Sequence, residues 1–345
     1  MKIINMLSSA DKIKGQGVGS AYLEQVALVE DGLKNQFEVK INSKKKGDIN
    51  HYHTIDLKHY IKAMTSKKTV NLGYVHFLPE TIDGSIKLPK PFRKVFDSYI
   101  ISFYKKMDYL VTVNPYFIDL LEAHGLDKSK ISYIPNYVSS TKFHPLDKDL
   151  IEQGKERFQL HENDFVILGV GQVQTRKGVM DFIGLAKKNP DKIFVWAGGF
   201  SFGAITDGYQ ELKELVNNPP NNVKFIGIID RKDMNLIYNI ADVLFMPSYS
   251  ELFPMAILEA MSVGTPILLR DLEIYHAILD GYYLKGDCLN SFNTVINQLS
   301  YDKNYYEEAT EMSRAGSMFY SKGHVLEQWH DLYDQLCTES RVSNE

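Results

Sequence analysis

Two glutamates, Glu251 and Glu259, lie in the stretch of sequence whose residue types most clearly suggest chemistry. The stretch follows DVLFMP (242–247), an apolar run that predicts a buried strand, and Pro254 suits the first turn of a helix. Glu251 is then expected in the loop at the carboxyl end of the strand, and Glu259 just over one turn into the helix. Carboxylates accept two hydrogen bonds well, which suits vicinal hydroxyl groups.

The start of this helix adds a second kind of contact. Free backbone amides at a helix start favour a phosphate, and here they belong to Phe253, Met255 and Ala256. The two carboxylates and these amides together suit a ligand with a phosphate in its middle and hydroxyls at both ends. Taken singly, however, Glu251 would be expected to cap the helix and Glu259 to pair on its surface.

A second stretch, GVGQVQTRKG (169–178), directly follows the apolar run FVIL. Its glycines allow close approach of the backbone to a ligand, and Arg176 and Lys177 provide charge for a diphosphate. The spacing is not that of a P-loop, and it departs from the dinucleotide fingerprint. Alone, the stretch is equally typical of a strand–turn–helix junction with solvated basic residues.

Apolar, β-branched runs alternate with segments of helical period along the chain, which predicts two parallel sheets covered by helices on both faces. Strands are expected at 2–7, 49–53, 69–77, 109–113, 165–171, 192–198, 222–227, 242–247 and 266–270, and helices of the first half at 19–33, 55–66, 92–106 and 115–124. A polar stretch with two prolines, 135–149, predicts a hinge. We therefore expect an α/β protein with domains 1–145 and 146–320, followed by 321–345, a helix over 321–336 that could pack on either domain and a disordered end from 338.

Composition limits the class of protein. The 345 residues are 44 % apolar and 24 % charged, with two distant cysteines, Cys288 and Cys337, which favours a reducing compartment over a disulfide framework. We find neither a signal peptide nor about 20 consecutive apolar residues to span a bilayer. Residues 1–145 carry 21 basic and 14 acidic side chains and the remainder 18 and 29, so the halves are expected to face different partners.

Together the two stretches resemble the retaining glycosyltransferases of family four, which have the GT-B fold of two Rossmann-like domains facing a central cleft. The family's Glu-x7-Glu element matches Glu251 to Glu259, its Ala-Met-x-x-Gly-x-Pro segment matches 260–266, and its Gly-Arg-x4-Lys-Gly element matches 171–178. The resemblance covers nearly the whole chain. It includes a glycine loop at 15–20, a histidine after an early strand at His76, and a Pro-Asn linker at 135–145.

The resemblance implies roles for individual residues. Glu259 would bind the ribose, Glu251 the transferred sugar, Lys177 the diphosphate, and His76 the sugar from the other domain. Contacts with the donor would also come from Gly171, Gln172, Phe253, Met255, Gly17 and Val18. The usual phosphate-binding arginine is Gln172 here, so we infer that Arg176 replaces it, while Leu252, Pro254 and Tyr137 stand where the family has glycines. No cluster of metal ligands is evident, so we expect a metal-independent enzyme without a cofactor, with the UDP-sugar as its substrate.

The acceptor must be inferred from the basic half. Residues 86–106 form a candidate amphipathic helix, with aromatic and aliphatic residues on one stripe and basic residues around it. Such a helix suits an anionic membrane surface, although its stripe could equally pack on the sheet. The expected membrane or acceptor contacts are Lys90, Phe92, Arg93 and Lys94.

Three loops, GQGVGSAYLEQ, GYVHFLPETIDGSIKLP and GQVQTRKG, are similar to those of a narrower group, the bacterial diglycosyl-diacylglycerol synthases. This similarity implies transfer of galactose or glucose, with a weak preference for galactose, from UDP-galactose or UDP-glucose to α-glucosyl-diacylglycerol. The product would be a membrane glycolipid and lipoteichoic acid anchor of a Gram-positive bacterium, made at the inner face of the cell membrane by a peripheral cytoplasmic enzyme. The alternatives are a soluble acceptor such as a capsule or teichoic acid, a catalytically silent GT-B scaffold, and a sugar-nucleotide epimerase. Nucleic acid is not expected as a partner, because no recognisable module carries the basic residues.

Overall fold

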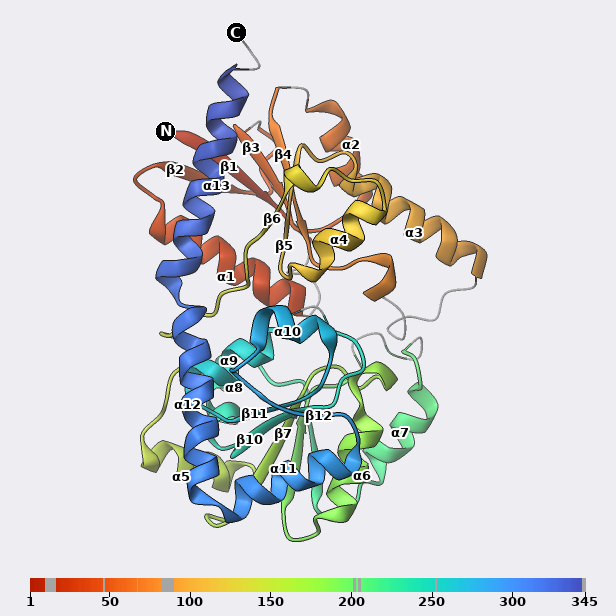
Figure 1. Cartoon of the computed structure of the whole chain (residues 1–345), viewed down its shortest axis with the longest axis vertical. Coiled ribbons are helices and arrows are strands. Elements are labelled where there is room, and N and C mark those ends of the chain that lie inside the picture. The colour runs from red at the N-terminus through yellow and green to blue at the C-terminus, as the bar shows by residue number, and fades with distance from the viewer. Residues whose placement is uncertain are drawn as a thin grey trace. The chain divides into compact units, whose positions relative to one another are not determined.

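The computed structural model describes residues 1–9, 17–45, 47–66, 68–81, 90–200, 203, 206–251 and 253–342. These residues fall into two compact units. Among the described residues, the first unit holds those up to 81, from 90 to 137 and from 320 to 342, and the second holds 138 to 319. The C-terminal segment therefore returns to the unit in which the chain begins (Figure 1).

The first unit is built on a parallel sheet of six strands in the order β2-β1-β3-β4-β5-β6. Its strands are β1 (Lys2–Leu7), β2 (Phe37–Ile41), β3 (Ile49–Tyr52), β4 (Val70–Val75), β5 (Tyr109–Thr112) and β6 (Ile131–Tyr133). Its helices are α1 (Gly17–Gly32), α2 (Leu57–Thr65), η2 (Pro79–Thr81), α3 (Lys90–Tyr104), α4 (Tyr116–Ala123), η3 (Lys128–Lys130) and α13 (Lys322–Val342). The strand order reverses between β1 and β3, as in other doubly wound sheets.

The second unit has its own six-stranded parallel sheet, in the order β12-β11-β10-β7-β8-β9. Its strands are β7 (Val166–Val170), β8 (Ile193–Ala197), β9 (Val223–Gly227), β10 (Val243–Met246), β11 (Ile267–Arg270) and β12 (Leu284–Gly286). Its helices are α5 (Lys148–Arg157), η4 (Thr175–Lys177), α6 (Val179–Lys188), α7 (Tyr209–Asn217), α8 (Arg231–Asn239), α9 (Met255–Val263), α10 (Glu273–Leu279), α11 (Leu289–Tyr301) and α12 (Lys303–Phe319). The order reverses between β7 and β10, which is the classic Rossmann arrangement.

The predicted fold class is confirmed, and every strand expected from the sequence is present. Three strands were not expected, namely β2, β6 and β12, and all three lie at an edge of a sheet. An edge strand is paired on one side only and carries polar residues, so it lacks the continuous apolar run of a central strand. The expectation of disorder from residue 338 was wrong as far as residue 342, because α13 continues to Val342.

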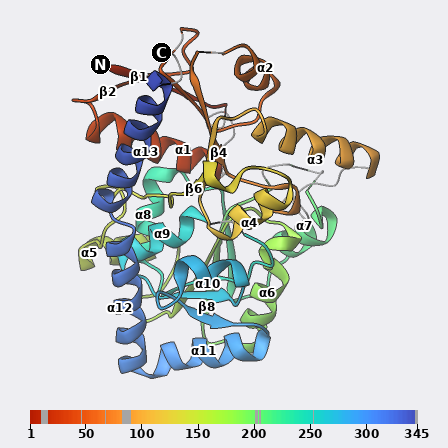
Figure 2. The ribbon, with the colours of Figure 1, turned by 45° about the horizontal axis from the view of Figure 1, so that its top comes forward.

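Helix α13 completes the core of the first unit. Trp329 and Tyr333 are almost fully buried, and the Trp329 ring lies 5.1 Å from that of His51 on β3 and 5.3 Å from that of Tyr74 on β4. The Tyr333 hydroxyl is 2.9 Å from Nδ1 of His51. Figures 1 and 2 both show α13 running beside α1. The last helix in the sequence thus covers the sheet made by the first strands.

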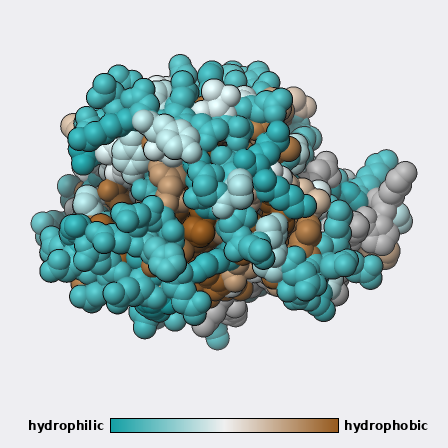
Figure 3. All heavy atoms as spheres, turned by 90° about the horizontal axis from the view of Figure 1, so that it is seen from below, coloured by the Kyte–Doolittle hydropathy of each residue, from teal (hydrophilic) through white to brown (hydrophobic). Residues whose placement is uncertain are grey.

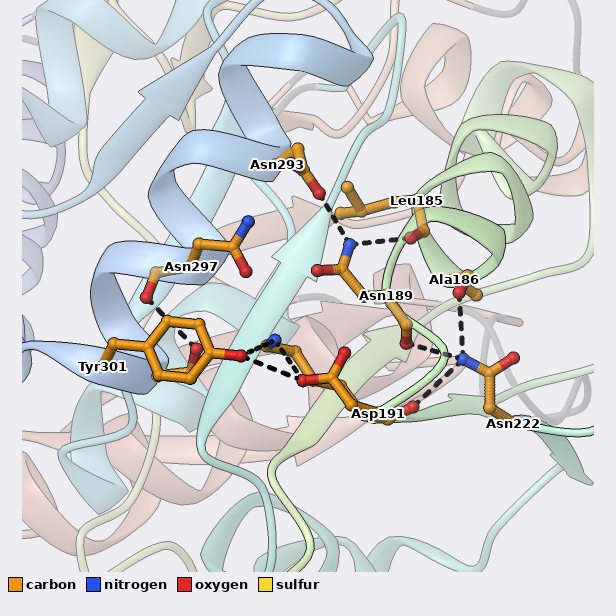
Figure 4. A network of polar contacts seen from close by, with 10 residues as sticks. Leu185, Ala186, Asn189, Asp191, Asn222, Asn293, Asn297 and Tyr301 are labelled. Atoms are coloured by element: carbon orange, nitrogen blue, oxygen red, sulfur yellow. Dashed lines mark hydrogen bonds and ion pairs between the residues drawn. The ribbon is translucent and has the colours of Figure 1, made fainter.

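A polar network lies at the amino-terminal end of β8, on the side of the second sheet opposite the carboxyl ends of its strands (Figure 4). The buried Lys192, just before β8, donates to Asp191 at 2.9 Å and lies 4.9 Å from the Tyr301 ring of α11. Asn189 donates to the Leu185 carbonyl and, from the same nitrogen, to Asn293. These contacts tie α6 and α11 to the start of β8, which stabilises the sheet that carries the functional loops.

Hydrophilic side chains predominate on the face seen in Figure 3, with a small hydrophobic area near its middle.

No helix in the described part of the chain is both long and apolar enough to cross a bilayer. Neither Cys288, which is exposed, nor Cys337, which is buried, forms a disulfide in the described part of the chain.

Candidate functional site

The site lies where the strand order of the second sheet reverses. Strands β7 and β10 are hydrogen-bonded neighbours there, and their carboxyl ends lead into the loops 171–178 and 247–254. Ligands of doubly wound sheets bind at such a position. The two stretches selected from the sequence are therefore adjacent in the fold, although they lie more than 70 residues apart in the chain.

Lys177 and Glu251 join the two loops directly. The Lys177 ammonium donates a hydrogen bond to Oε1 of Glu251, and Nη1 of Arg176 lies 3.8 Å from Oε2 of the same carboxylate. Nη1 of Arg176 also donates to the Ser250 carbonyl at 2.8 Å, while the Tyr249 amide donates to the Arg176 carbonyl at 2.7 Å. Glu251 and Lys177 are 6 % and 9 % exposed, so this pair is held away from bulk water.

Burial and charge act in opposite directions on the pair. Burial alone would raise the pKa of the Glu251 carboxyl, but the charges of Lys177 and Arg176 outweigh it and the net pKa is lowered. Burial lowers the pKa of Lys177, and Arg176 adds to this, while Glu251 opposes both. The carboxylate is therefore held ionised beside two cationic side chains.

Glycines permit the close packing around Lys177. Gly171 has a φ of 141°, and its carbonyl accepts a hydrogen bond from the Trp196 indole at 3.0 Å. Gly178 has a φ of 70°, and a Cβ there would lie 2.3 Å from the Pro247 carbonyl. A side chain at either position would disturb the loops that carry Lys177 and Glu251.

Glu259 has a different set of partners. It is 4 % exposed on α9, where its Oε1 accepts from Nη1 of Arg231 at 2.5 Å and its Oε2 accepts from the Tyr238 hydroxyl at 2.7 Å. Glu259 is thus not the surface residue that its position in a helix alone would suggest, and Glu251 lies in the loop rather than at the N-cap, which is Pro254. Neither Arg231 nor Tyr238 was predicted from the sequence. Arg231 comes soon after β9, and the preference of ligand contacts for strand carboxyl ends could have found it.

Several buried polar atoms near Lys177 and Glu251 have no partner among the described residues. They are Oε1 of Gln174, Nε of Arg176 and the hydroxyl of Tyr275. Tyr275 lies on α10, where burial, followed by the nearby Glu251 charge, raises its pKa well above the usual value. Buried polar atoms without partners are uncommon in native proteins and often mark the place of a ligand or water.

Three of the remaining expected donor contacts, Gln172, Phe253 and Met255, belong to these loops or to the start of α9. Gln172 accepts from Nε2 of Gln174 at 2.5 Å. Phe253 and Met255 are buried at the start of α9. Helix α1 begins at Gly17, but the side chains of Gly17 and Val18, together with residues 10–16 and Leu252, lie outside the described part of the chain.

His76 belongs to the first unit, where it follows β4. Its ring stacks 5.9 Å from that of His53, which follows β3 and lies 4.2 Å from His51. All three are buried, and burial lowers the pKa of His51 and of His76 to about 3 and that of His53 well below its usual value. The imidazoles are therefore neutral. The role of His76 toward a sugar stays a prediction.

The basic helix predicted in the first unit is α3. Phe92 is 68 % exposed and Lys94 is exposed, whereas the C-terminal part of the stripe, Ile100 and Phe103, is buried. Arg93 donates to Asp97 at 2.7 Å and to the Pro79 carbonyl at 2.5 Å. The side chain of Lys90 and residues 86–89 lie outside the described part. The C-terminal part of the stripe therefore packs inside the first unit, its N-terminal part is exposed, and contact with a membrane stays a prediction.

No group of three or more His, Cys, Asp or Glu side chains suited to a metal ion is found among the described residues. The charged groups around the site are instead the three cations Arg176, Lys177 and Arg231, together with the two glutamates.

Comparisons with known proteins agree with this geometry. A family model for glycosyl transferases group 1 matches residues 151–314. The α-galactosylglucosyldiacylglycerol synthase of Streptococcus pneumoniae is 42 % identical over 339 residues, which cover 98 % of this chain and 91 % of that protein. The processive diacylglycerol α-glucosyltransferase of Acholeplasma laidlawii is 26 % identical, with 92 % of each chain covered.

Solved structures show the same fold. HepE of Anabaena in complex with UDP and glucose superposes with a TM-score of 0.77 at 15 % identity, covering 97 % of this chain and 100 % of that one. Sucrose-phosphate synthase of Thermosynechococcus elongatus gives a TM-score of 0.79 at 16 % identity, covering 98 % and 100 %. The fold is GT-B. Its two parallel-sheet units, the paired loops at the switch point and the extended identity to a glycolipid synthase together show that this chain belongs to the group 1 glycosyl transferases.

Proposed function

We propose that the protein transfers galactose or glucose from a UDP-sugar to α-glucosyl-diacylglycerol, giving a diglycosyl-diacylglycerol. The observation that carries the proposal is the pairing of Lys177 with Glu251 across the two loops of the switch point. The 42 % identity to an α-galactosylglucosyldiacylglycerol synthase, over 91 % of its length, supports this acceptor and favours galactose. The expected use of the product is as a membrane glycolipid and lipoteichoic acid anchor.

The site is suited to hold a UDP-sugar at three points. Glu259, oriented by Arg231 and Tyr238, accepts hydrogen bonds from the ribose hydroxyls. Arg176 and Lys177 bind the diphosphate, and Glu251 accepts hydrogen bonds from the transferred sugar. In the ligand-free protein Lys177 and Glu251 keep each other charged, and each exchanges this contact for one with the donor when the donor binds.

The chemistry requires negative charge to be stabilised as the bond between sugar and phosphate breaks. Arg176 and Lys177 supply positive charge at that place in a site largely shielded from water, where electrostatic stabilisation is strongest. The acceptor hydroxyl attacks from the face of the leaving group and the departing phosphate takes its proton, so the product keeps the α configuration. No protein nucleophile and no metal ion is needed in this mechanism.

The first unit is proposed to face an anionic membrane, with residues 1–145 serving the acceptor and 146–320 the donor. On α3, Phe92 and Val95 are 68 % and 71 % exposed, and on α2 three apolar side chains on one helical stripe, Leu57, Ile61 and Met64, are 54–65 % exposed. The two helices touch through the hydroxyls of Tyr60 and Ser102, 2.9 Å apart. Residues 56–68 and 90–106 carry net charges of +3 and +4. Exposed apolar side chains flanked by lysines are typical of interfacial helices, which supports a peripheral location at the inner face of the membrane.

The proposal is tested by incubating the purified protein with vesicles that contain phosphatidylglycerol and α-glucosyl-diacylglycerol, and with UDP-galactose or UDP-glucose. We expect a diglycosyl-diacylglycerol with an α linkage, identified by mass and linkage analysis. Lys177→Ala should abolish its formation, whereas Arg157→Gln, at a side chain that is 56 % exposed, should not. Failure to form product with either donor would contradict the proposal, and transfer only to a water-soluble acceptor would replace it.

A further inference from the structure

Arg270, the last residue of β11, makes an unusual number of contacts at the base of the loop that carries Glu251. Its Nε donates to the Pro247 carbonyl at 3.0 Å, its Nη1 to the Asp287 carbonyl at 2.8 Å, and its Nη2 to Oδ2 of Asp181 at 2.5 Å. All three guanidinium nitrogens are therefore engaged. The side chain is 11 % exposed, so these bonds are largely shielded from water.

The same aspartate oxygen also holds Tyr249. The Tyr249 hydroxyl donates to Oδ2 of Asp181 at 2.6 Å, and the Arg270 guanidinium lies 4.0 Å from the centre of the Tyr249 ring. Arg270, Asp181 and Tyr249 thus contact one another in pairs, and we call this group the clamp. The clamp holds the loop 247–251 at two points, the Pro247 carbonyl and the Tyr249 side chain.

The clamp is connected to the charged pair through the backbone. Tyr249 is two residues from Glu251, and its amide donates to the Arg176 carbonyl at 2.7 Å. Arg176 returns a bond from its side chain to the Ser250 carbonyl at 2.8 Å. A shift of Tyr249 would therefore move the Glu251 loop relative to the turn that carries Arg176 and Lys177.

From these contacts we infer that Arg270 is a positioning residue, which sets the place of Glu251 relative to Lys177 through Asp181 and Tyr249. The inference rests on the proposed function of Glu251 and Lys177 toward a UDP-sugar. The three nitrogens of the planar guanidinium each donate to a different acceptor here, whereas a lysine would donate to all of its acceptors from a single nitrogen. The part of the donor that contacts Glu251 should depend on the clamp, and the ribose held by Glu259 should not.

Arg270→Gln tests this prediction in the full-length protein. Affinity for the UDP-hexose should fall by about tenfold while affinity for UDP stays within about threefold, and kcat should fall roughly 10- to 100-fold, since a small misplacement of catalytic groups has effects of this size. Arg270→Lys should resemble Arg270→Gln. Arg157→Gln is the matched control, because Arg157 also pairs with an aspartate, Asp233, at 3.4 Å and lies 5.4 Å from an aromatic ring. It should leave every value unchanged.

Two results would overturn the inference. The first is that Arg270→Gln lowers only the stability of the protein. At temperatures where the variant is folded, its kcat and its ratio of UDP-hexose affinity to UDP affinity would then equal those of the wild type. The other is full recovery in Arg270→Lys, which would show that charge rather than geometry matters. If Arg270→Gln does not fold, Tyr249→Phe provides the test, because it removes only the bond to Asp181. Its affinity for the UDP-hexose should fall a few-fold more than its affinity for UDP. An equal change in the two affinities would contradict the clamp.

Amide hydrogen exchange separates this inference from the proposed function. The Tyr249 amide should exchange faster in Arg270→Gln than in the wild type, whereas amides within β7 should not change. This measurement needs no substrate. Faster exchange in a protein that transfers no sugar would support the clamp and contradict the proposed function, whereas unchanged exchange would contradict the clamp whatever the activity.

Discussion

The Lys177 ammonium donates a hydrogen bond to the Glu251 carboxylate, and this contact joins two loops that lie 74 residues apart in the chain. Each partner would be costly to bury alone, and each is proposed to contact the donor. The pair therefore links the stability of the second unit with its activity, and mutations can separate the two.

Lys177→Met should reduce turnover by at least about 100-fold, because it removes one stabilising cation from the site. It should also lower the free energy of unfolding by about 3 kcal/mol, since Glu251 then stays buried with only Arg176 nearby. The double variant Lys177→Met/Glu251→Gln should regain most of that stability but none of the activity. Urea unfolding and product formation measure the two effects, and wild-type turnover in Lys177→Met would exclude the assigned role.

Glu259→Gln should weaken the binding of UDP by about tenfold, because a charged hydrogen-bond acceptor of the ribose is replaced by a neutral one. Tyr238→Phe removes a partner that orients Glu259 but leaves the carboxylate and Arg231 in place. Its effect on the dissociation constant of UDP, measured by calorimetry, should be smaller. Equal affinity in Glu259→Gln and the wild type would show that the ribose binds elsewhere.

The buried histidines should make the first unit sensitive to acid. His51 and His76 have pKa values of about 3 in the folded protein, compared with about 6.5 when unfolded, so the unfolded chain binds more protons between these values. Stability is then fully present above about pH 6.5 and is lost as the pH falls, by up to about 1.4 kcal/mol per pH unit for each histidine. His53→Gln should reduce this slope by one proton. Denaturant unfolding from pH 4.5 to 7.5 provides the measurement.

Asp242 should have the opposite effect in the second unit. Burial raises its pKa from 3.8 to about 6 in the folded protein, and its Oδ2 accepts a hydrogen bond from the Val166 amide at 2.7 Å. The native state therefore holds the proton more tightly than the unfolded state, and stability decreases as the pH rises from about 4 through 6. Asp242→Asn should be more stable than the wild type at pH 8, by about 1–3 kcal/mol, with the gap closing near pH 4. A constant difference between the two proteins across that range would contradict the shift.

Replacing Leu57, Ile61 and Met64 by serine should weaken binding to phosphatidylglycerol vesicles by about tenfold, and replacing Phe92 and Val95 should have a similar effect. Added salt should weaken the wild type further because the lysines act electrostatically. Met318→Ser, in the second unit and also exposed, is the control. Vesicle co-sedimentation gives the affinities, and unchanged binding in both sets would place the membrane contact on another surface.

The sequence was sufficient for the fold class, which follows from strong local patterns. The roles of the site residues toward the donor rest on the family resemblance and stay predictions. Continuous apolar runs indicate central parallel strands, and the carboxyl ends of such strands indicate where Glu251 and Lys177 should lie. Their direct contact could not be predicted, since it depends on the order of β7 and β10 in the sheet.

Arg231, Tyr238 and Arg270 were missed for a related reason. Each acts by contacting a residue far away in the chain, and no local spacing distinguishes such a residue from a surface arginine or a core tyrosine. The edge strands β2, β6 and β12 were missed because half of their pairing surface is free, so their side chains follow no simple apolar pattern.

The return of α13 to the first unit determines the order in which the protein can be completed during synthesis. His51 and Tyr333 are 282 residues apart in the chain yet 2.9 Å apart in the fold. Translation proceeds at about 5–20 residues per second. The ribosome therefore needs roughly 10–40 s after residue 137 to synthesise the chain through α13, the helix that covers Tyr74 and His51. The apolar face that α13 covers is exposed for that time, and transiently exposed apolar surface of this kind is prone to non-native association.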